Sequence, residues 1–143
     1  MAYDPENIFA KILRGEMAAW KVYEDEATLA FMDVMPQSPG HVLVIPKVEA
    51  ENLFDLDPEA GAAVLRTTQR VARAVKSAMG ADGIMLNQFN GPSAGQTVFH
   101  FHVHIVPRFD SVPLRRHAGG MEDSEVLAEQ AAKIAAAIDR GDD

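Results

Sequence analysis

Three histidines, His100, His102 and His104, alternate with apolar residues in one short segment of the chain. Alternate side chains of a β-strand point to the same face, so a strand over Thr97–Val106 would carry all three imidazoles on one side. A single histidine in such a strand is ordinarily a hydrogen-bonded, half-buried residue. Three at alternate positions exceed what chance places on one strand face, and the pattern therefore indicates a chemical site.

Metal binding and nucleophilic catalysis are the two chemistries that such a row of imidazoles offers. A His-x-His pair on a strand can bind zinc at about 2.0–2.1 Å, but the first and last of three rings would lie roughly 13 Å apart along the strand. All three cannot surround one ion unless the strand bends, and no Asp or Glu interrupts the triplet. We therefore expect no metal at this site.

Electrostatic repulsion between the rings favours the nucleophile. Rings roughly 7 Å apart on alternate positions repel by about 2.4 kcal/mol when both are protonated, for an effective dielectric of about 20. At least one ring therefore stays a neutral imidazole with an available lone pair, which is the state that a nucleophile needs. Attack on phosphorus suits this row, because the other rings can donate hydrogen bonds to charged oxygens.

The loop before the histidines, Asn90–Gly95, is rich in glycine and other small residues. Such a loop lets backbone N–H groups approach an anion closely, and two polar side chains follow it. We expect a contribution to substrate binding from Asn90, Gly95, Gln96 and Thr97. Taken alone, a connection rich in glycine and proline is as readily an ordinary turn.

The composition limits the class of protein that presents this site. The chain has 143 residues, about the length of one domain. Its 13 basic and 21 acidic residues give a net charge of −8, which argues against a nucleic-acid-binding surface. It has no cysteine, hence no disulfide, thiolate zinc site or cysteine nucleophile. With no leader pattern and no apolar run near the ~18 residues of a membrane span, we expect a cytoplasmic protein that contacts no membrane.

The elements that must position the histidines follow from hydrophobic periodicity and from capping and turn residues. Asp-Pro pairs precede two of the expected helices, and Gly80 ends the longer one. The pattern predicts an α+β fold, a five-stranded antiparallel sheet covered by helices. The expected strands are Trp20–Tyr23, Thr28–Met32, His41–Ile45, Ile84–Phe89 and Thr97–Val106; the expected helices are Ile8–Leu13, a long one from Pro58 to Met79, and a C-terminal one near Ser124–Ile138.

Two segments resemble the signature blocks of the histidine triad (HIT) family of nucleotide hydrolases and transferases. They are Ala94–Arg108, which contains the three histidines, and Pro39–Lys47; with a weaker N-terminal match the resemblance spans Ile8 to Arg108. It implies one domain over residues 1–143, with a core of about 5–109 and a C-terminal extension of 110–143. It also implies a five-stranded antiparallel sheet with two main helices, to which this chain adds a C-terminal helix, and a homodimer.

The same resemblance assigns roles to individual residues. It makes His102 the nucleophile that attacks the α-phosphorus and forms a covalent nucleotidyl-histidine, which water then hydrolyses. His104 would contact the phosphate oxygens, and His100 and His41 would form a supporting hydrogen-bond relay. Gln96 and Thr97 would lie beside the leaving group and the phosphate, and Asp33 would bind the ribose hydroxyls.

Departures from the family pattern narrow these expectations. Zinc-containing members carry Cys-x-x-Cys near the N-terminus and a later histidine, where this chain has Asn7, Ala10 and Glu49. We therefore expect no structural zinc and no cofactor. His104 stands where the uridylyltransferase branch has glutamine, which favours hydrolysis over transfer.

The leading functional hypothesis is a hydrolase like the purine nucleoside phosphoramidases, which releases a nucleoside monophosphate. The closest alternative is a dinucleoside polyphosphate hydrolase, because Arg115, Arg116 and His117 could reach additional phosphates; such a basic cluster is more often simply solvated. A regulatory nucleotide-binding protein with incidental turnover and a metal-binding protein are alternatives of other classes.

Overall fold

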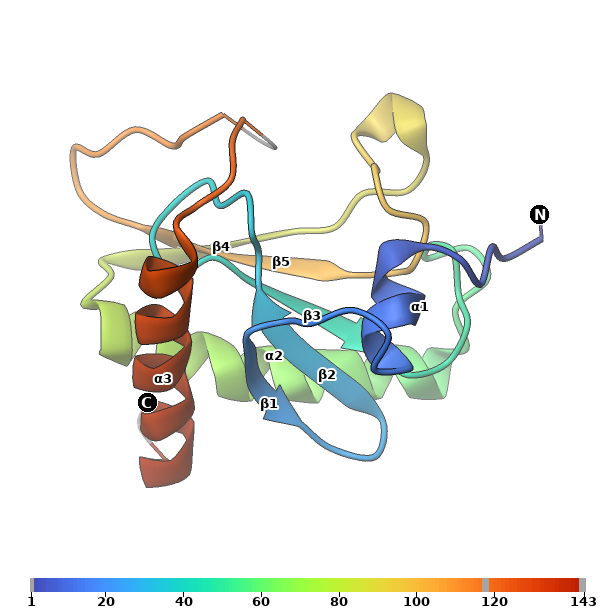
Figure 1. Ribbon diagram of the computed structural model, residues 1–143, viewed down its shortest axis with the longest axis horizontal. Coiled ribbons are helices and arrows are strands. Elements are labelled where there is room, and N and C mark those ends of the chain that lie inside the picture. Colours follow the sequence, from blue (N-terminus) through green and yellow to red (C-terminus); the bar gives the residue numbers. More distant parts are fainter. Residues whose placement is uncertain (1, 117–118, 142–143) are drawn as a thin grey trace.

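The sheet of the computed structural model, which describes residues 2–116 and 119–141, has the order β1-β2-β3-β5-β4, and all of its neighbouring strands are antiparallel (Figure 1). The central strands β2 and β3 are buried along their whole length, as expected for strands covered on both faces. The strands are β1 (Lys21–Glu24), β2 (Thr28–Met32), β3 (Val42–Pro46), β4 (Gly83–Asn87) and β5 (Val103–Arg108).

Helices cover the two faces of this sheet unequally. On one face α2 (Pro58–Met79) and α3 (Ser124–Arg140) pack on alternate residues of β2 and β3, including Ala30 and Val44. On the other face the short helix α1 (Ile8–Leu13) packs on the intervening residues, including Phe31 and Leu43 (Figure 1). Because α1 has only 6 residues, it leaves part of its face free for a binding site.

The ends of the long helix lie where the sequence places them. Asp57 is the N-cap of α2, Pro58 occupies its first turn, and Gly80 ends it in the left-handed conformation with φ of 63°, which glycine adopts without steric cost. The sequence-based prediction of a five-stranded antiparallel sheet with two main helices and a C-terminal helix is confirmed. None of the described helices combines the length and the apolarity that a membrane span requires.

The segment that carries the histidines differs from its prediction. Strand β5 begins at Val103, so only His104 lies in the sheet, and the prediction of one strand with three imidazoles on one face is wrong. The backbone approaches a different partner: Phe101 N–H donates to the carbonyl of Ala50 at 2.8 Å. This bond holds His100 and His102 outside the regular ladder and gives each ring its own surroundings.

Candidate active site

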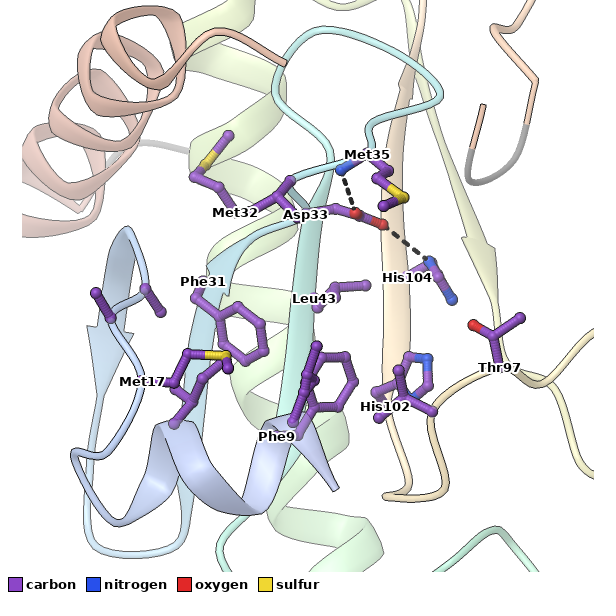
Figure 2. A pocket seen from close by; sticks show the side chains of 16 residues that line it. Phe9, Met17, Phe31, Met32, Asp33, Met35, Leu43, Thr97, His102 and His104 are labelled. Atoms are coloured by element: carbon purple, nitrogen blue, oxygen red, sulfur yellow. Dashed lines mark hydrogen bonds and ion pairs between the residues drawn. The ribbon is translucent and has the colours of Figure 1, made fainter. Parts of the chain in front are cut away.

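A cavity of about 340 Å³ lies between α1 and the sheet, a volume typical of small-molecule sites. One end of it is apolar, formed by side chains of α1 and of β2 and β3. The other end presents Asp33, Thr97, His102 and His104 (Figure 2). The apolar residues at the first end include Ile8, Phe9, Ile12, Met17, Phe31 and Leu43.

His102 stands at the polar end with a defined distribution of hydrogens on its ring. Its Nδ1 lies 2.7 Å from the backbone carbonyl oxygen of His100. Because a carbonyl only accepts, Nδ1 must carry the hydrogen, and the lone pair of a neutral ring is then on Nε2. The ring of Phe9 meets the imidazole edge to face, with centroids 4.9 Å apart and an interplanar angle of 90°, and fixes its orientation further.

His104 has the opposite distribution, which a relay from the backbone imposes. The amide N–H of Gln37 donates to Nδ1 of His41 at 3.0 Å, so the hydrogen of the His41 ring is on Nε2. That Nε2 lies 3.0 Å from Nδ1 of His104, which must therefore accept. His104 consequently carries its hydrogen on Nε2, the ring nitrogen on the side away from Asp33 (Figure 2).

Asp33 lies at the polar end of the cavity, beside the imidazoles of His41 and His104. One carboxylate oxygen accepts from the backbone N–H of Met35 at 2.8 Å, and the other lies 3.4 Å from His41 Nε2 and 4.0 Å from His104 Nδ1. Ligand atoms of these three side chains lie within 4.8 Å of one another, and they form the one group of described residues with spacing that suits a metal ion. The 3.0 Å bond between the two imidazoles already accounts for their proximity.

His100 points away from the cavity and into the protein. Its Nε2 lies 2.8 Å from the carbonyl oxygen of Pro46, and its Nδ1 is hydrogen-bonded to the hydroxyl of Tyr3. Burial lowers the pKa of His100 below its ordinary value, against a smaller opposing effect of the hydrogen bond to Pro46. The ring is therefore neutral near pH 7 and contributes to the site through its backbone carbonyl.

The residues predicted for the preceding loop divide into two groups. Thr97 lines the cavity, whereas Asn90, Gly95 and Gln96 do not. The Gln96 side chain accepts from Gly91 N–H at 2.8 Å and donates to the backbone carbonyls of Glu51 and Val98. Asn90 likewise accepts from the amide of Leu53 at 2.8 Å. These two side chains hold the loop framework that positions Thr97.

The basic cluster after β5 is only partly described, because His117 lies outside the described residues. Arg115 pairs with Glu122 at 2.9 Å, and its backbone N–H donates to the carbonyl of Gln37 at 2.8 Å. Arg115 therefore braces the loop that anchors His41. Arg116 lies beside it, with Pro36, along a separate shallow cavity.

Sequence reasoning missed three contributors to the site: Tyr3, Phe9 as a contact of His102, and the amide of Gln37. The contact of Phe9 with His102 joins two segments far apart in the sequence, and a backbone amide leaves no signal in residue type. Gly40, which precedes His41, has a positive φ of 86°, and a Cβ atom at this position would clash with the side chain of Met79.

Taken together, the polar end offers a lone pair and an N–H on two rings whose centroids are 5.0 Å apart. A lone pair can attack an electrophilic centre, and an adjacent N–H can stabilise negative charge on an oxygen bound to that centre. The carboxylate and the apolar end can hold the rest of a ligand that is part polar and part aromatic.

Known proteins are similar to this chain in sequence and in fold. Residues 14–111 match the HIT domain family. The chain is 39% identical over 117 residues to adenylylsulfatase HINT3 from Arabidopsis thaliana, a match that covers 78% of this chain and 59% of the plant protein. A HIT-like protein of Bartonella henselae involved in cell-cycle regulation, solved with an unknown ligand, has 48% identity and a TM-score of 0.89, over 95% of this chain and 99% of that one.

A second solved structure, a hypothetical histidine triad nucleotide-binding protein from Sulfolobus tokodaii, has 34% identity and a TM-score of 0.84, with 92% of this chain and 91% of that one covered. The family thus includes nucleotide-binding proteins and hydrolases. The resemblance of the histidine segment to the HIT signature is confirmed, and the chain belongs to the histidine triad (HIT) family.

Proposed function

We propose that the protein is a nucleotide hydrolase that releases a nucleoside monophosphate through a covalent nucleotidyl-histidine at His102. The observation that carries this proposal is the pairing of opposite tautomers at the polar end of the cavity. His102 presents a lone pair on Nε2, and His104 presents an N–H, on rings 5.0 Å apart. A nucleophile beside a hydrogen-bond donor is what displacement at phosphorus needs.

The reaction proceeds in two displacements. In the first, Nε2 of His102 bonds to the α-phosphorus while the bond from phosphorus to the leaving group breaks, and the leaving group departs with the electron pair and gains a proton. In the second, water attacks the same phosphorus and the P–N bond to His102 breaks, with its electron pair returning to Nε2. Water releases one proton to the solvent, which replaces the proton that the leaving group took from the solvent. The Nε2–H of His104 stabilises the charge on a non-bridging oxygen in both steps.

The rest of the nucleotide fits the remaining cavity. The base would lie among the apolar side chains that include Phe9 and Phe31, where an aromatic ring gains from burial and edge contacts. Asp33 would accept from the ribose hydroxyls, and the position of its side chain on the cavity wall beside His104 supports this role (Figure 2). Thr97 would contact the phosphate or the leaving group.

A purine nucleoside phosphoramidate or mixed anhydride is the substrate class that we favour over a dinucleoside polyphosphate. Arg115 is paired with Glu122 and bonded to the Gln37 loop, so it has a structural role that competes with binding of distant phosphates. The related plant protein is an adenylylsulfatase, and adenylyl sulfate is a mixed anhydride.

Steady-state comparison of adenosine phosphoramidate, adenylyl sulfate and diadenosine tetraphosphate tests this order. We expect kcat/KM for one of the two small substrates to exceed that for the dinucleotide. Rapid acid-free quench followed by peptide mass spectrometry should place a nucleotidyl group on His102. A strong preference for the dinucleotide would reverse the order of substrates, and a covalent adduct on any other residue would refute the assignment of the nucleophile.

We further propose that the protein forms a homodimer through the outer edge of β4. This strand lies at the edge of the sheet, with Leu86 48% exposed, and Leu65 of α2 beside it is 65% exposed. A second copy would cover these apolar side chains and the unpaired strand edge. Sedimentation should give a dimer for the wild type and a monomer for Leu86→Lys. Val126→Lys, at a 36% exposed apolar position on α3, which packs on the opposite edge strand β1, should stay dimeric.

A further inference from the structure

A hydrogen-bonded chain leads from the N-terminal segment to the proposed nucleophile. The Tyr3 hydroxyl is bonded to Nδ1 of His100, and the His100 carbonyl oxygen lies 2.7 Å from Nδ1 of His102. The rings of Tyr3 and His100 also meet edge to face, with centroids 5.6 Å apart. Tyr3 is thus separated from the reacting ring by one residue, although it lies outside the cavity.

In this series of hydrogen bonds, the backbone carbonyls can only accept, and this determines which atom donates in each bond. His100 Nε2 lies against the carbonyl of Pro46 at 2.8 Å, so it must carry the ring hydrogen. Nδ1 of the neutral ring then accepts, and the Tyr3 hydroxyl donates to it. Burial raises the pKa of this hydroxyl, an effect that a hydrogen bond from Asn7 partly opposes and that the charge of Glu49 reinforces. Tyr3 therefore stays a protonated donor.

Hydrogen bonds anchor the segment around Tyr3 to helix α1. Asn7 caps α1 by accepting from Phe9 N–H and Ala10 N–H at 3.1 and 3.0 Å, and its own amide donates to the carbonyl of Asp4 at 2.7 Å. Arg14 at the other end of α1 donates to the carbonyl of Pro5 at 2.6 Å. The N-terminal segment is therefore tied to the same helix whose Phe9 ring contacts His102.

We infer that Tyr3 is a positioning residue of the hydrolytic site, which acts by holding His100 in one orientation so that its carbonyl directs the Nε2 lone pair of His102 toward phosphorus. The expected effect of Tyr3 on turnover rests on the proposed function. The expected effect of Tyr3 on the orientation of the His100 ring does not, so the two effects can be tested separately.

Tyr3→Phe removes the hydroxyl and keeps the aromatic contact, and Tyr23→Phe is the matched control. Tyr23 is the only other tyrosine in the chain and its hydroxyl donates to Asp25 on the turn after β1, away from the site. We expect kcat of Tyr3→Phe to fall about tenfold with KM changed less than about twofold, because only the orientation of the nucleophile is altered. Tyr23→Phe should retain wild-type kcat and KM.

Two readouts separate positioning from a general structural role. Imidazole ¹⁵N NMR should show one sharp set of His100 ring signals in the wild type and in Tyr23→Phe, and a broadened or doubled set in Tyr3→Phe, because the bond from Nε2 to Pro46 alone leaves the ring free to sample a second orientation. In a double-mutant cycle, Tyr3→Phe should cause no further loss of kcat in a His100→Gln background, because Tyr3 acts through that ring.

Unchanged kcat together with unchanged His100 ring signals in Tyr3→Phe would overturn the assignment, as would additive losses in the cycle. If the wild-type protein hydrolyses none of the nucleotide substrates, the proposed function fails, and the ring signals alone then decide whether Tyr3 orients His100. A Tyr3→Phe variant with a lowered melting temperature but wild-type kcat and His100 ring signals would overturn the assignment, because Tyr3 would then only anchor the chain end.

Discussion

The imidazoles of His102 and His104 are two positions apart in the sequence, yet the protein prepares them for opposite tasks. A carbonyl oxygen, that of His100, faces Nδ1 of His102 and leaves a lone pair at Nε2. An amide N–H, that of Gln37, acts through His41 and leaves an N–H at Nε2 of His104. The comparison shows that backbone groups decide which of two identical side chains can attack and which can donate.

Removal of the His102 ring is expected to have the largest effect. His102→Ala should lower kcat by about four orders of magnitude, because covalent catalysis is lost while binding groups remain. Nucleotide affinity, measured by calorimetry, should change little, and the circular dichroism spectrum should be that of the wild type. Substantial residual turnover by this variant would break the distinction between the two rings.

Removal of the donor should cost less. His104→Ala should lower kcat by about two to three orders of magnitude, the usual effect of losing one hydrogen-bond donor to a developing oxyanion. Unlike His102→Ala, it should still form the covalent intermediate, which quenched-flow mass spectrometry would detect at a reduced rate. If His104→Ala forms none and His102→Ala does, the two roles are reversed.

Asp33 lies beside His41 and His104, and the loss of its charge should act mainly on nucleotide binding. Asp33→Asn should weaken nucleotide affinity about tenfold, through the loss of charge-assisted hydrogen bonds to the ribose. Replacing the ribonucleotide by a 2′-deoxynucleotide should lower the affinity of Asp33→Asn less than it lowers the affinity of the wild type. Equal losses for ribose and deoxyribose ligands would remove Asp33 from the ribose site.

The smallest expected effect concerns stability on the His102 side. Burial lowers the pKa of His100, so the unfolded chain binds a proton more readily than the folded one below the ordinary value of 6.5. The stability that the neutral ring contributes is complete above that pH and is lost as the pH falls toward the folded pKa, with a slope of at most about 1.4 kcal/mol per pH unit. Melting temperatures between pH 7.5 and pH 5.5 should therefore fall less steeply for His100→Gln than for the wild type, and parallel curves would contradict this.

The fold was largely open to prediction because its determinants are local. The Asp57-Pro58 pair and Gly80 mark the ends of α2, and short continuous apolar runs mark β2 and β3. The importance of the triad segment was also visible, since three regularly spaced histidines are conspicuous in any sequence.

The geometry of the site depends on contacts that no local pattern reports. His100 leaves the ladder because Phe101 bonds to Ala50, about fifty residues away, and its ring then meets Tyr3 from the N-terminal segment. The polar side chain of Gln96 after a glycine-rich loop predicts a contact with a ligand, and the sequence does not show that its amide also bonds to backbone groups of Gly91, Glu51 and Val98. Residue type predicts what a side chain can bond to, and the tertiary fold decides what it meets.

The edge-to-face contact between Phe9 and His102 also bears on the stereochemistry of the proposed reaction. Because the Phe9 ring packs against the imidazole, a phosphorus atom bonded to Nε2 keeps its position. The incoming water must then approach from the side that the leaving group vacated. Two in-line displacements at one centre invert it twice. A substrate made chiral at phosphorus by a sulfur substituent and an oxygen isotope should therefore yield a product of retained configuration.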